Sequence, residues 1–227
     1  MTQRKLALIT GASRGIGSAV ARALANTHEL LLGGRDPRSL QSLADEFPAA
    51  RPWPVELTDQ DALAQAAAGI KRLDVLVHSA GVAELGDIAD TPAEVWRRHF
   101  EVNVVAVAEL TRLLLPALRA GGGHVVVINS GAGRNPNPGW GAYAASKFAV
   151  RAFADVLRDE EPGIRVTTVY PGRTATDMQR RVRAHEGGEF EPDKYLLPES
   201  VAAAVRAAVT ATDDAHVQEV IIRPRPH

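Results

Sequence analysis

The 227-residue sequence contains no cysteine, which excludes disulfide bonds and thiolate metal sites. Its seven histidines show no spacing typical of metal ligands, so we expect no bound metal. Neither sign of charge dominates, because 26 basic and 27 acidic residues are interspersed and give a net charge of −1. The sequence therefore carries no electrostatic footprint for nucleic acid or for an anionic membrane surface.

Long apolar runs are also missing. No stretch reaches the roughly 18 apolar residues that a membrane-spanning helix needs. The richest stretch, residues 102–118, is interrupted by Asn103, Glu109, Arg112 and Pro116. Only five apolar-type residues precede Gly11, fewer than the roughly 7–15 of a secretory signal. We therefore expect a soluble, cytoplasmic protein.

What the sequence does contain is a regular alternation of short strand-like runs and Ala-rich helical stretches. The runs are bare apolar segments, as expected for strands that are covered on both faces. This alternation predicts an α/β fold with a doubly wound parallel sheet, and the length fits a single domain over residues 1–227. The expected strands are Leu6–Thr10, Glu29–Leu32, Pro52–Leu57, Val75–His78, His124–Asn129, Val166–Tyr170 and Val220–Ile222.

Helix starts and irregular stretches complete this outline. Asp36-Pro37 and Thr91-Pro92-Ala93-Glu94 each predict an N-cap followed by proline at the first helical position, the second as a capping box. Pro198 opens a helix through Val209. The least regular stretches, residues 131–140 and 173–197, are candidate walls of a substrate site, since ligands bind beyond the carboxyl ends of such strands. Ordinary surface loops are the alternative.

A glycine-rich turn follows the first expected strand. Gly11, Gly15 and Gly17 have the spacing Gly-x-x-x-Gly-x-Gly. Glycines allow the chain to turn sharply beside a pyrophosphate, while the following helix N-terminus supplies amide donors. The turn predicts nucleotide binding; a tight strand–helix connection is the alternative.

The second expected strand indicates which dinucleotide is bound. A site selective for NAD usually places an acidic residue here, to accept a hydrogen bond from the ribose 2′-hydroxyl. This sequence has Gly34 and Arg35 instead, with Arg14 in the glycine turn and Asp36 better explained as a helix cap. Because two guanidinium groups suit a 2′-phosphate, we predict NADP(H) as the cofactor.

Tyr143 and Lys147 are four residues apart and so share one face of a predicted helix. There an ammonium group can favour the phenolate form of a tyrosine, whose unperturbed pKa is about 10. Such a pair is often only a solvated helix face. The glycine turn, Asn103 and Ser130 make it a candidate catalytic pair instead.

With these motifs the sequence resembles the short-chain dehydrogenase/reductase family from Leu6 to about Ile222. Thr10–Gly17 is similar to the family's cofactor turn, and Leu73–Gly81 to its fourth strand and the Asn-Asn-Ala-Gly segment. Ser130, thirteen residues before Tyr143, matches the catalytic serine. Asn103 matches the family's helix-embedded asparagine, and Pro171-Gly172 with Thr176 the segment that holds the nicotinamide.

The resemblance implies a seven-stranded Rossmann-type sheet and a homotetramer or homodimer. It implies that Asn103, Ser130, Tyr143 and Lys147 are catalytic, with Asn103 breaking its helix and holding a water. The residues expected to bind the cofactor are Gly11, Ser13, Arg14, Gly15, Ile16, Gly17, Arg35, Glu56, Leu57, Ala80, Gly81, Tyr143, Lys147, Pro171, Gly172, Thr174 and Thr176. The sequence departs from the family pattern in two places: His78-Ser79 replaces two asparagines, and Glu56 replaces an aspartate near the adenine. We expect His78 to be structural.

Trp140 and the arginine cluster at residues 180–183 each allow two interpretations. Trp140 could line the substrate cleft or anchor its loop on the following helix. The arginines of Arg180-Arg181-x-Arg183 could bind an anionic substrate, but the acidic residues that follow favour a solvated helix end.

Two functions remain open. The first is an NADP(H)-dependent oxidoreductase that acts on a small-molecule carbonyl or alcohol, with Tyr143 as general acid or base. The second is a regulatory or interaction protein that binds the nucleotide without turnover. The complete catalytic set favours the first, and an extended-family epimerase is a weaker third possibility.

Overall fold

The computed structural model describes residues 4–225 as one seven-stranded parallel sheet between two layers of helices. The prediction of a doubly wound parallel sheet is confirmed. The expected single domain over residues 1–227 includes five terminal residues that lie outside the described ones. The strands are β1 (Lys5–Ile9), β2 (His28–Gly34), β3 (Ala50–Pro54), β4 (Val75–His78), β5 (His124–Ile128), β6 (Arg165–Pro171) and β7 (Glu219–Ile222).

The strand order in the sheet is β3-β2-β1-β4-β5-β6-β7. The chain builds outward from β1 to β3 and then returns to place β4 on the other side of β1. This reversal separates the connections that follow β1 and β4 and opens a crevice at their carboxyl ends, the usual ligand site of such sheets.

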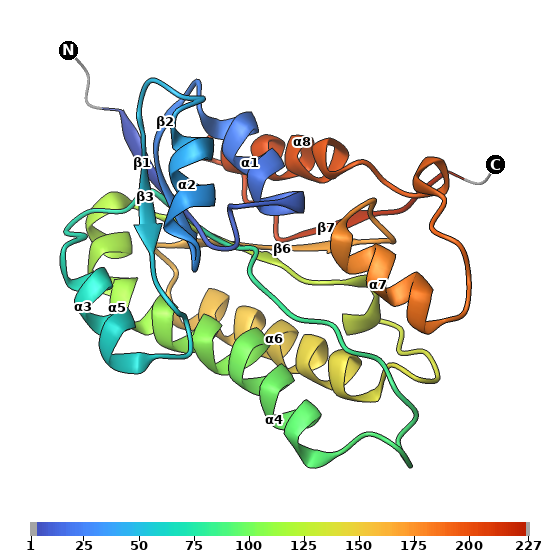
Figure 1. The fold of residues 1–227 in the computed structure, drawn as a ribbon. Coiled ribbons are helices and arrows are strands. Elements are labelled where there is room, and N and C mark those ends of the chain that lie inside the picture. Colours follow the sequence, from blue (N-terminus) through green and yellow to red (C-terminus); the bar gives the residue numbers. More distant parts are fainter. Residues whose placement is uncertain (1–3, 226–227) are drawn as a thin grey trace.

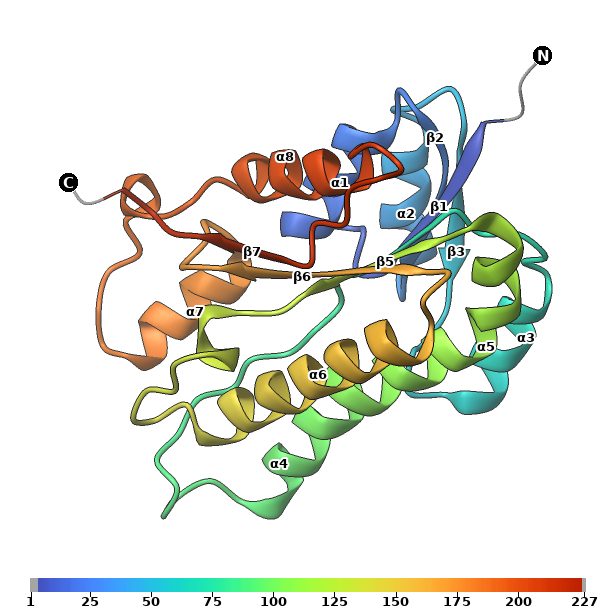
Figure 2. The same ribbon diagram turned by 180° about the vertical axis from the view of Figure 1, so that it is seen from behind.

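Helices cover both faces of the sheet (Figures 1 and 2). One layer holds α1 (Gly15–Leu24), α2 (Pro37–Ala44) and α8 (Pro198–Val209). The other holds α3 (Gln60–Ala68), α4 (Ala93–Phe100), α5 (Ala106–Gly121) and α6 (Gly141–Glu160). The short helix α7 (Asp177–His185) follows β6 and lies at one end of the sheet rather than over the middle of a face.

Alternate residues of each strand enter two separate cores. In β1, Ala7 and Ile9 pack on the α1 and α8 side, whereas Leu8 packs on the α5 and α6 side. All three side chains are fully buried. Burial of both faces explains why the strands are bare apolar runs in the sequence.

Two of the predicted helix starts are confirmed, and one is wrong. The Asp36 side chain caps α2 by accepting from the Arg38 N–H at 3.1 Å, and α8 begins at Pro198. Thr91, however, does not cap α4, because its hydroxyl donates to the Asp87 carbonyl oxygen at 2.7 Å. Pro92 is instead the N-cap residue, and α4 begins at Ala93.

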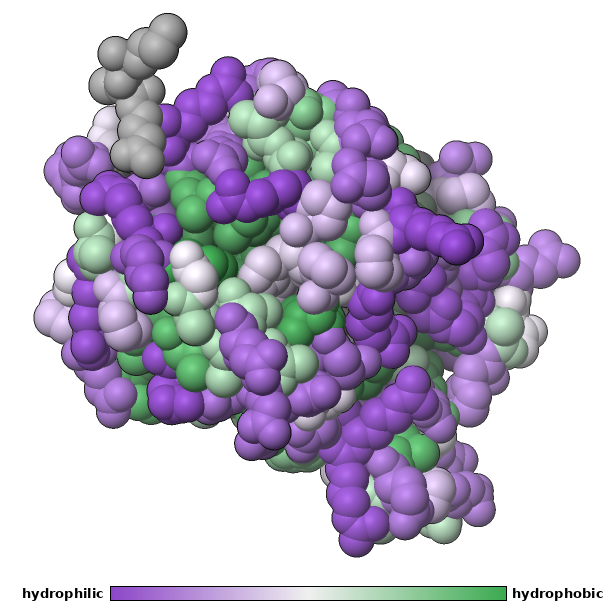
Figure 3. Space-filling view, turned by 60° about the vertical axis from the view of Figure 1, so that its left-hand side comes forward, coloured by the Kyte–Doolittle hydropathy of each residue, from purple (hydrophilic) through white to green (hydrophobic). Residues whose placement is uncertain are grey.

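Hydrophilic side chains surround smaller apolar areas on the face that carries β3 (Figure 3). Among residues 4–225, no helix is both long and apolar enough to cross a bilayer.

His78, at the end of β4, is a structural histidine, as expected. It is buried, and its Nε2 lies 2.9 Å from the Thr111 hydroxyl oxygen. That hydroxyl donates to the Val107 carbonyl, so the His78 N–H is the donor in this contact. Burial lowers the pKa of His78 to about 3, so the folded protein holds this ring neutral.

This burial predicts acid sensitivity. The unfolded chain takes up a proton on His78 below pH 6.5, whereas the folded chain does so only near pH 3. Stability is therefore lost as the pH falls through this window, by up to about 1.4 kcal/mol per pH unit for each such histidine. We expect His78→Asn to reduce the loss between pH 6 and 5 by about 1 kcal/mol, measured by urea unfolding. An unchanged slope would contradict this assignment.

Candidate active site

A cavity of about 700 Å³ opens at the carboxyl ends of the central strands. Its walls come from the connections after β1, β4, β5 and β6 and from α7. All the residues predicted to bind the cofactor line it, and so do three of the four predicted catalytic residues. The fourth, Asn103, does not line the cavity.

The glycine turn after β1 has the shape that a pyrophosphate requires. Gly11 adopts a positive φ of 64°, and a Cβ there would lie 2.8 Å from the Ala80 nitrogen. A Cβ at Gly17 would lie only 2.2 Å from the Gly11 carbonyl oxygen. Helix α1 starts within this motif, at Gly15, and no side chain caps its N-terminus. The first amide groups of α1 therefore remain available to an anionic ligand, so the turn fits a dinucleotide.

Two arginines lie at this end of the cavity. Arg35 pairs with Glu56 at 3.6 Å, and Arg14 lies 4.0 Å from Asp177. All four side chains are largely exposed, so these ion pairs are weak and can exchange partners. The Glu56 carboxylate also accepts from the backbone N–H and the hydroxyl of Thr58.

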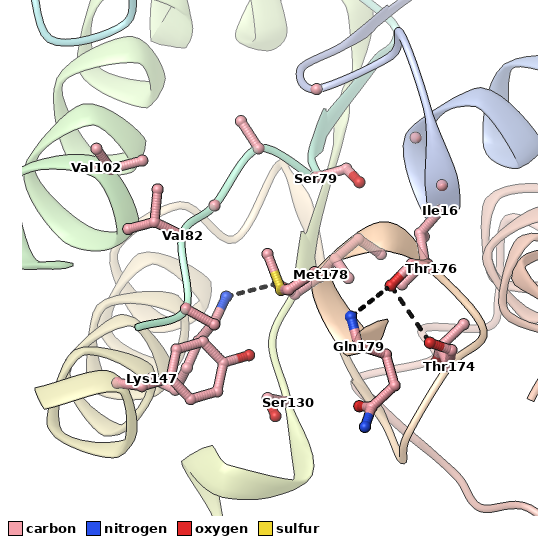
Figure 4. Close-up of a pocket in the computed structure, with 18 of the residues that line it drawn as sticks. Ile16, Ser79, Val82, Val102, Ser130, Lys147, Thr174, Thr176, Met178 and Gln179 are labelled. Carbon is pink, nitrogen blue, oxygen red and sulfur yellow. Dashed lines mark hydrogen bonds between the residues drawn. The ribbon is translucent and has the colours of Figure 1, made fainter. Parts of the chain in front are cut away.

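The candidate catalytic side chains lie on the opposite wall (Figure 4). Tyr143 and Lys147 lie in the first turns of α6, and each residue is only 7% exposed. The Lys147 Nζ lies 5.8 Å from the centroid of the Tyr143 ring and donates to the Ile128 carbonyl oxygen at 3.1 Å. Ser130 follows β5, and its hydroxyl accepts from the Ala132 N–H at 3.1 Å. The helix and the strand end therefore bring together the three residues that the sequence spacing indicated.

The pKa of Tyr143 differs from our expectation. Burial raises this pKa above 10, and a hydrogen bond with Ser130 opposes only part of the increase. The prediction that Lys147 lowers the Tyr143 pKa is therefore wrong for the chain alone. Lys147 uses its ammonium on the Ile128 carbonyl and is itself buried, which lowers its pKa to about 8. Desolvation dominates both groups.

Asn103 breaks its helix, as the family resemblance implied. Residues Glu101–Val105 form a π-helical turn between α4 and α5. The Asn103 carboxamide accepts from the Val82 N–H at 2.9 Å, and donates to the Val82 carbonyl and the Ser146 hydroxyl, each at 3.0 Å. This side chain thus joins the segment after β4 to α6 from behind the cavity. A water held by Asn103 stays a prediction.

The stretch 173–197, expected to be irregular, contains helix α7 and the 3-10 turn Pro192–Lys194. Thr176 caps α7 by accepting from the Gln179 N–H, and its hydroxyl donates to the Thr174 carbonyl (Figure 4). Arg173 donates to both carboxylate oxygens of Glu186 at 2.7 Å. The sequence indicated only the end of this helix, at Arg180–Arg183, because its residues are mostly polar or charged and a strong apolar stripe is absent.

Trp140 lies between the cavity and the first turn of α6. It lines the cavity, with its ring centroid 5.7 Å from that of Tyr143 and 5.8 Å from the Arg173 guanidinium. Its backbone also forms an isolated bridge to Gly86, which anchors the stretch 131–140. Of the three nearby arginines, Arg183 pairs with Glu186, Arg180 lies over the Phe190 ring and Arg181 lines the cavity.

Sequence reasoning placed the stretch 173–197 in a candidate substrate wall but did not single out Arg173, Met178 or Gln179. Arg173, Met178 and Gln179 all line the cavity. Their only sequence signal is their position just after the Pro171-Gly172 segment and within the first turn of the helix that Thr176 caps.

Within residues 4–225, no group of three or more His, Asp or Glu side chains could hold a metal ion.

Known proteins share this arrangement. A family model described as short chain dehydrogenase matches residues 5–187. Dehydrogenase/reductase SDR family member 7B of Bos taurus is 36% identical over 225 residues, a match that covers 91% of this chain and 68% of that protein. A glycine betaine reductase of Emericella nidulans is 38% identical over 237 residues; the match covers 97% of this chain but only 19% of that much longer protein.

Solved structures agree with the sequence matches. An alcohol dehydrogenase from the archaeon Thermococcus sibiricus, complexed with 5-hydroxy-NADP, superimposes with a TM-score of 0.90 at 28% identity, covering 99% of this chain and 100% of that one. The closed form of a serine dehydrogenase complexed with NADP+ gives 0.89 at 26% identity, with coverages of 96% and 94%.

The fold and the cavity are those of a dinucleotide-dependent oxidoreductase. The chain belongs to the short-chain dehydrogenase/reductase family, whose members are NAD(P)-dependent enzymes that act on CH–OH or C=O groups of small molecules.

Proposed function

We propose that this protein is an NADP(H)-dependent oxidoreductase that interconverts a carbonyl and a secondary alcohol, with Tyr143 as the general acid or base. The observation that carries the proposal is the meeting of Tyr143, Lys147 and Ser130 on the wall of a cavity whose other end is the glycine turn. A protein that only binds the nucleotide has no need of these three groups together.

The cofactor, when bound, supplies or accepts the hydride. This chain manages the accompanying proton. The Tyr143 hydroxyl donates its proton to the substrate oxygen during reduction and takes it back during oxidation. Because burial raises its pKa, Tyr143 is protonated at neutral pH and ready to act as an acid.

Ser130 and Lys147 support this proton transfer. The Ser130 hydroxyl, which moderates the pKa of Tyr143, can donate to the same substrate oxygen and stabilise the charge that develops there. Lys147 does not lower the pKa of Tyr143 in the chain alone, but its ammonium group lies beside the Tyr143 ring and would, in the complex with cofactor and substrate, favour the phenolate that remains after the proton has left. Lys147 would also hold the nicotinamide ribose, while the Pro171–Thr176 segment would hold the nicotinamide.

The choice of NADP(H) over NAD(H) rests on Arg14 and Arg35 together with the cofactors named for the solved relatives. We expect Arg35→Ser and Arg14→Ser each to raise the Kd of NADPH about 10-fold and to leave NADH binding nearly unchanged, since only NADPH carries the 2′-phosphate. Fluorescence titration measures both constants. Arg38→Ser, an exposed arginine on α2 outside the cavity, is the matched control. Equal affinity of the wild type for NADH and NADPH would refute this choice.

The enzymatic proposal itself is tested by following NADPH absorbance with a panel of ketones, aldehydes and quinones. Turnover supports the oxidoreductase, whereas NADPH binding without turnover of any compound supports the catalytically silent alternative.

We also propose that the protein forms a homodimer or homotetramer. The exposed apolar side chains of Phe148 and Val156 on α6, and of Val105 beside it, support this proposal.

A further inference from the structure

His99 is a fully buried histidine beside the side chain of Tyr143. It lies in the last turn of α4, its exposed fraction is 0%, and it does not line the cavity. The centroid of its ring lies 6.2 Å from that of the Tyr143 ring, at an interplanar angle of 73°. Edge-to-face contacts of this kind are favourable and depend on how the two rings are oriented. His99 therefore contacts the proposed general acid from outside the cavity.

Both ring nitrogens of His99 are bound to backbone groups. Nδ1 lies 2.7 Å from the Val95 carbonyl oxygen, which can only accept, so Nδ1 carries the proton. Nε2 accepts from the Glu84 backbone N–H at 3.1 Å. The ring is therefore a neutral tautomer, and neither nitrogen is free to exchange a proton with Tyr143. These bonds exclude a role in proton transfer and leave a role in positioning.

The Glu84 N–H lies in the segment after β4 that packs against Tyr143. Ala83 and Leu85, on either side of Glu84, pack against the small apolar cluster that contains the Tyr143 ring. The bond from His99 to the Glu84 N–H thus fixes the backbone between these two side chains. His99 acts on Tyr143 in two ways, by direct ring contact and through this segment.

Asn103, four residues after His99, holds the same segment. Its carboxamide binds both backbone groups of Val82. Two buried side chains about one helical turn apart therefore hold alternate residues of the segment, Val82 and Glu84. The Glu84 carboxylate also lies 3.5 Å from Arg98, but both of these side chains are largely exposed, so that ion pair holds the segment only weakly.

We propose that His99 is a positioning residue for the proton transfer, because it fixes the Tyr143 ring directly and, through the Glu84 N–H, keeps the apolar neighbours of that ring in place. This assignment rests on the proposed function and adds to it a group that acts only through Tyr143. When the imidazole is removed, the Glu84 N–H loses its partner, and the segment has to shift to regain one from water. The Tyr143 hydroxyl then loses its fixed place in the cavity.

A double-mutant cycle tests this route. The kcat for the panel carbonyl that the wild type reduces fastest is measured for the wild type, His99→Leu, Tyr143→Phe and the double variant, with enough enzyme to follow the slow proteins. We expect His99→Leu to lower kcat about 10- to 100-fold, as a misplaced catalytic group does, while the Kd of NADPH stays near the wild-type value. In Tyr143→Phe no hydroxyl is left to position, so the same substitution should lower kcat less than about 3-fold.

Equal falls in kcat in the two backgrounds would overturn the assignment, because His99 would then act independently of the Tyr143 hydroxyl. A wild-type kcat in His99→Leu would also overturn it. If Tyr143→Phe loses activity as expected while the two changes multiply, the proposed function stands and only the role of His99 falls. A wild type that reduces no compound of the panel overturns both.

Two further variants separate positioning from a general effect on stability, with the Tm measured for each. His99→Gln keeps an acceptor for the Glu84 N–H and should recover part of the kcat that His99→Leu loses. Placed in both backgrounds, it repeats the cycle with a milder change in case His99→Leu folds poorly. His28→Leu is the matched control, since His28 is 3% exposed but lies at the start of β2, at the opposite end of that strand from the cavity.

The kcat of His28→Leu should stay near the wild-type value, whatever the change in its Tm. An equal loss of kcat in His28→Leu and His99→Leu would contradict a positioning role, and so would a His99→Gln variant that recovers none of the lost kcat.

Discussion

Replacing Tyr143 with phenylalanine should reduce kcat by about 10²–10⁴-fold, the usual contribution of a general acid. The ring and its contacts with Trp140 and Lys147 remain, so the fold and the binding of NADPH should persist. The loss should therefore appear in kcat rather than in the Kd of NADPH, because only the proton donor has been removed. Steady-state kinetics and a fluorescence titration on the same preparation measure the two quantities.

Tyr195→Phe is the control for this change. Tyr195 also follows β6, packs beside Phe190 and does not line the cavity. Its loss of a hydroxyl should leave turnover near the wild-type value. Retention of near-full activity by Tyr143→Phe would refute the role assigned to Tyr143.

Lys147→Met should also lower kcat/KM by at least about 10²-fold, but with a different signature. This variant removes the ammonium group that the proposal assigns both to the phenolate and to the ribose, so the affinity for NADPH should fall as well. The Ile128 carbonyl also loses its donor. Lys71→Met, an exposed lysine between α3 and β4, should change neither quantity.

The pH profile distinguishes an electrostatic role of Lys147 from simple packing. Burial lowers the pKa of Lys147 to about 8, so its ammonium group is present at neutral pH and is lost as the pH rises through that value. NADPH binding by the wild type should weaken above about pH 8, and Lys147→Met should lack this transition. An identical pH dependence in the two proteins would contradict an electrostatic role for Lys147.

The sequence predicted those parts of the site that local chemistry determines. The glycine turn was visible because only glycine tolerates the backbone approach at Gly11 and Gly17. The strands were visible because both faces of the sheet are buried. The pair on α6 was visible because four residues make about one helical turn.

The remaining features depend on tertiary packing, which local pattern does not encode. The pKa of Tyr143 rises because of burial at the junction of β5 and α6, and the spacing of two residues carries no information on desolvation. The Thr91 hydroxyl bonds backward to Asp87 rather than forward to a helix. His99 is one polar residue among several in a mostly polar helix, and only the folded chain shows that its ring contacts Tyr143.

The central claim, hydride transfer in this cavity, is tested most directly by isotope labelling. NADPH carrying deuterium at the transferable position of C4 is incubated with the enzyme and the carbonyl panel, and the alcohol products are analysed by mass spectrometry. The account predicts one deuterium on the carbinol carbon of each alcohol formed from the ketones and aldehydes of the panel, and no labelled product with Tyr143→Phe over the same period. An alcohol product without deuterium, or no product while NADPH binds tightly, would contradict it.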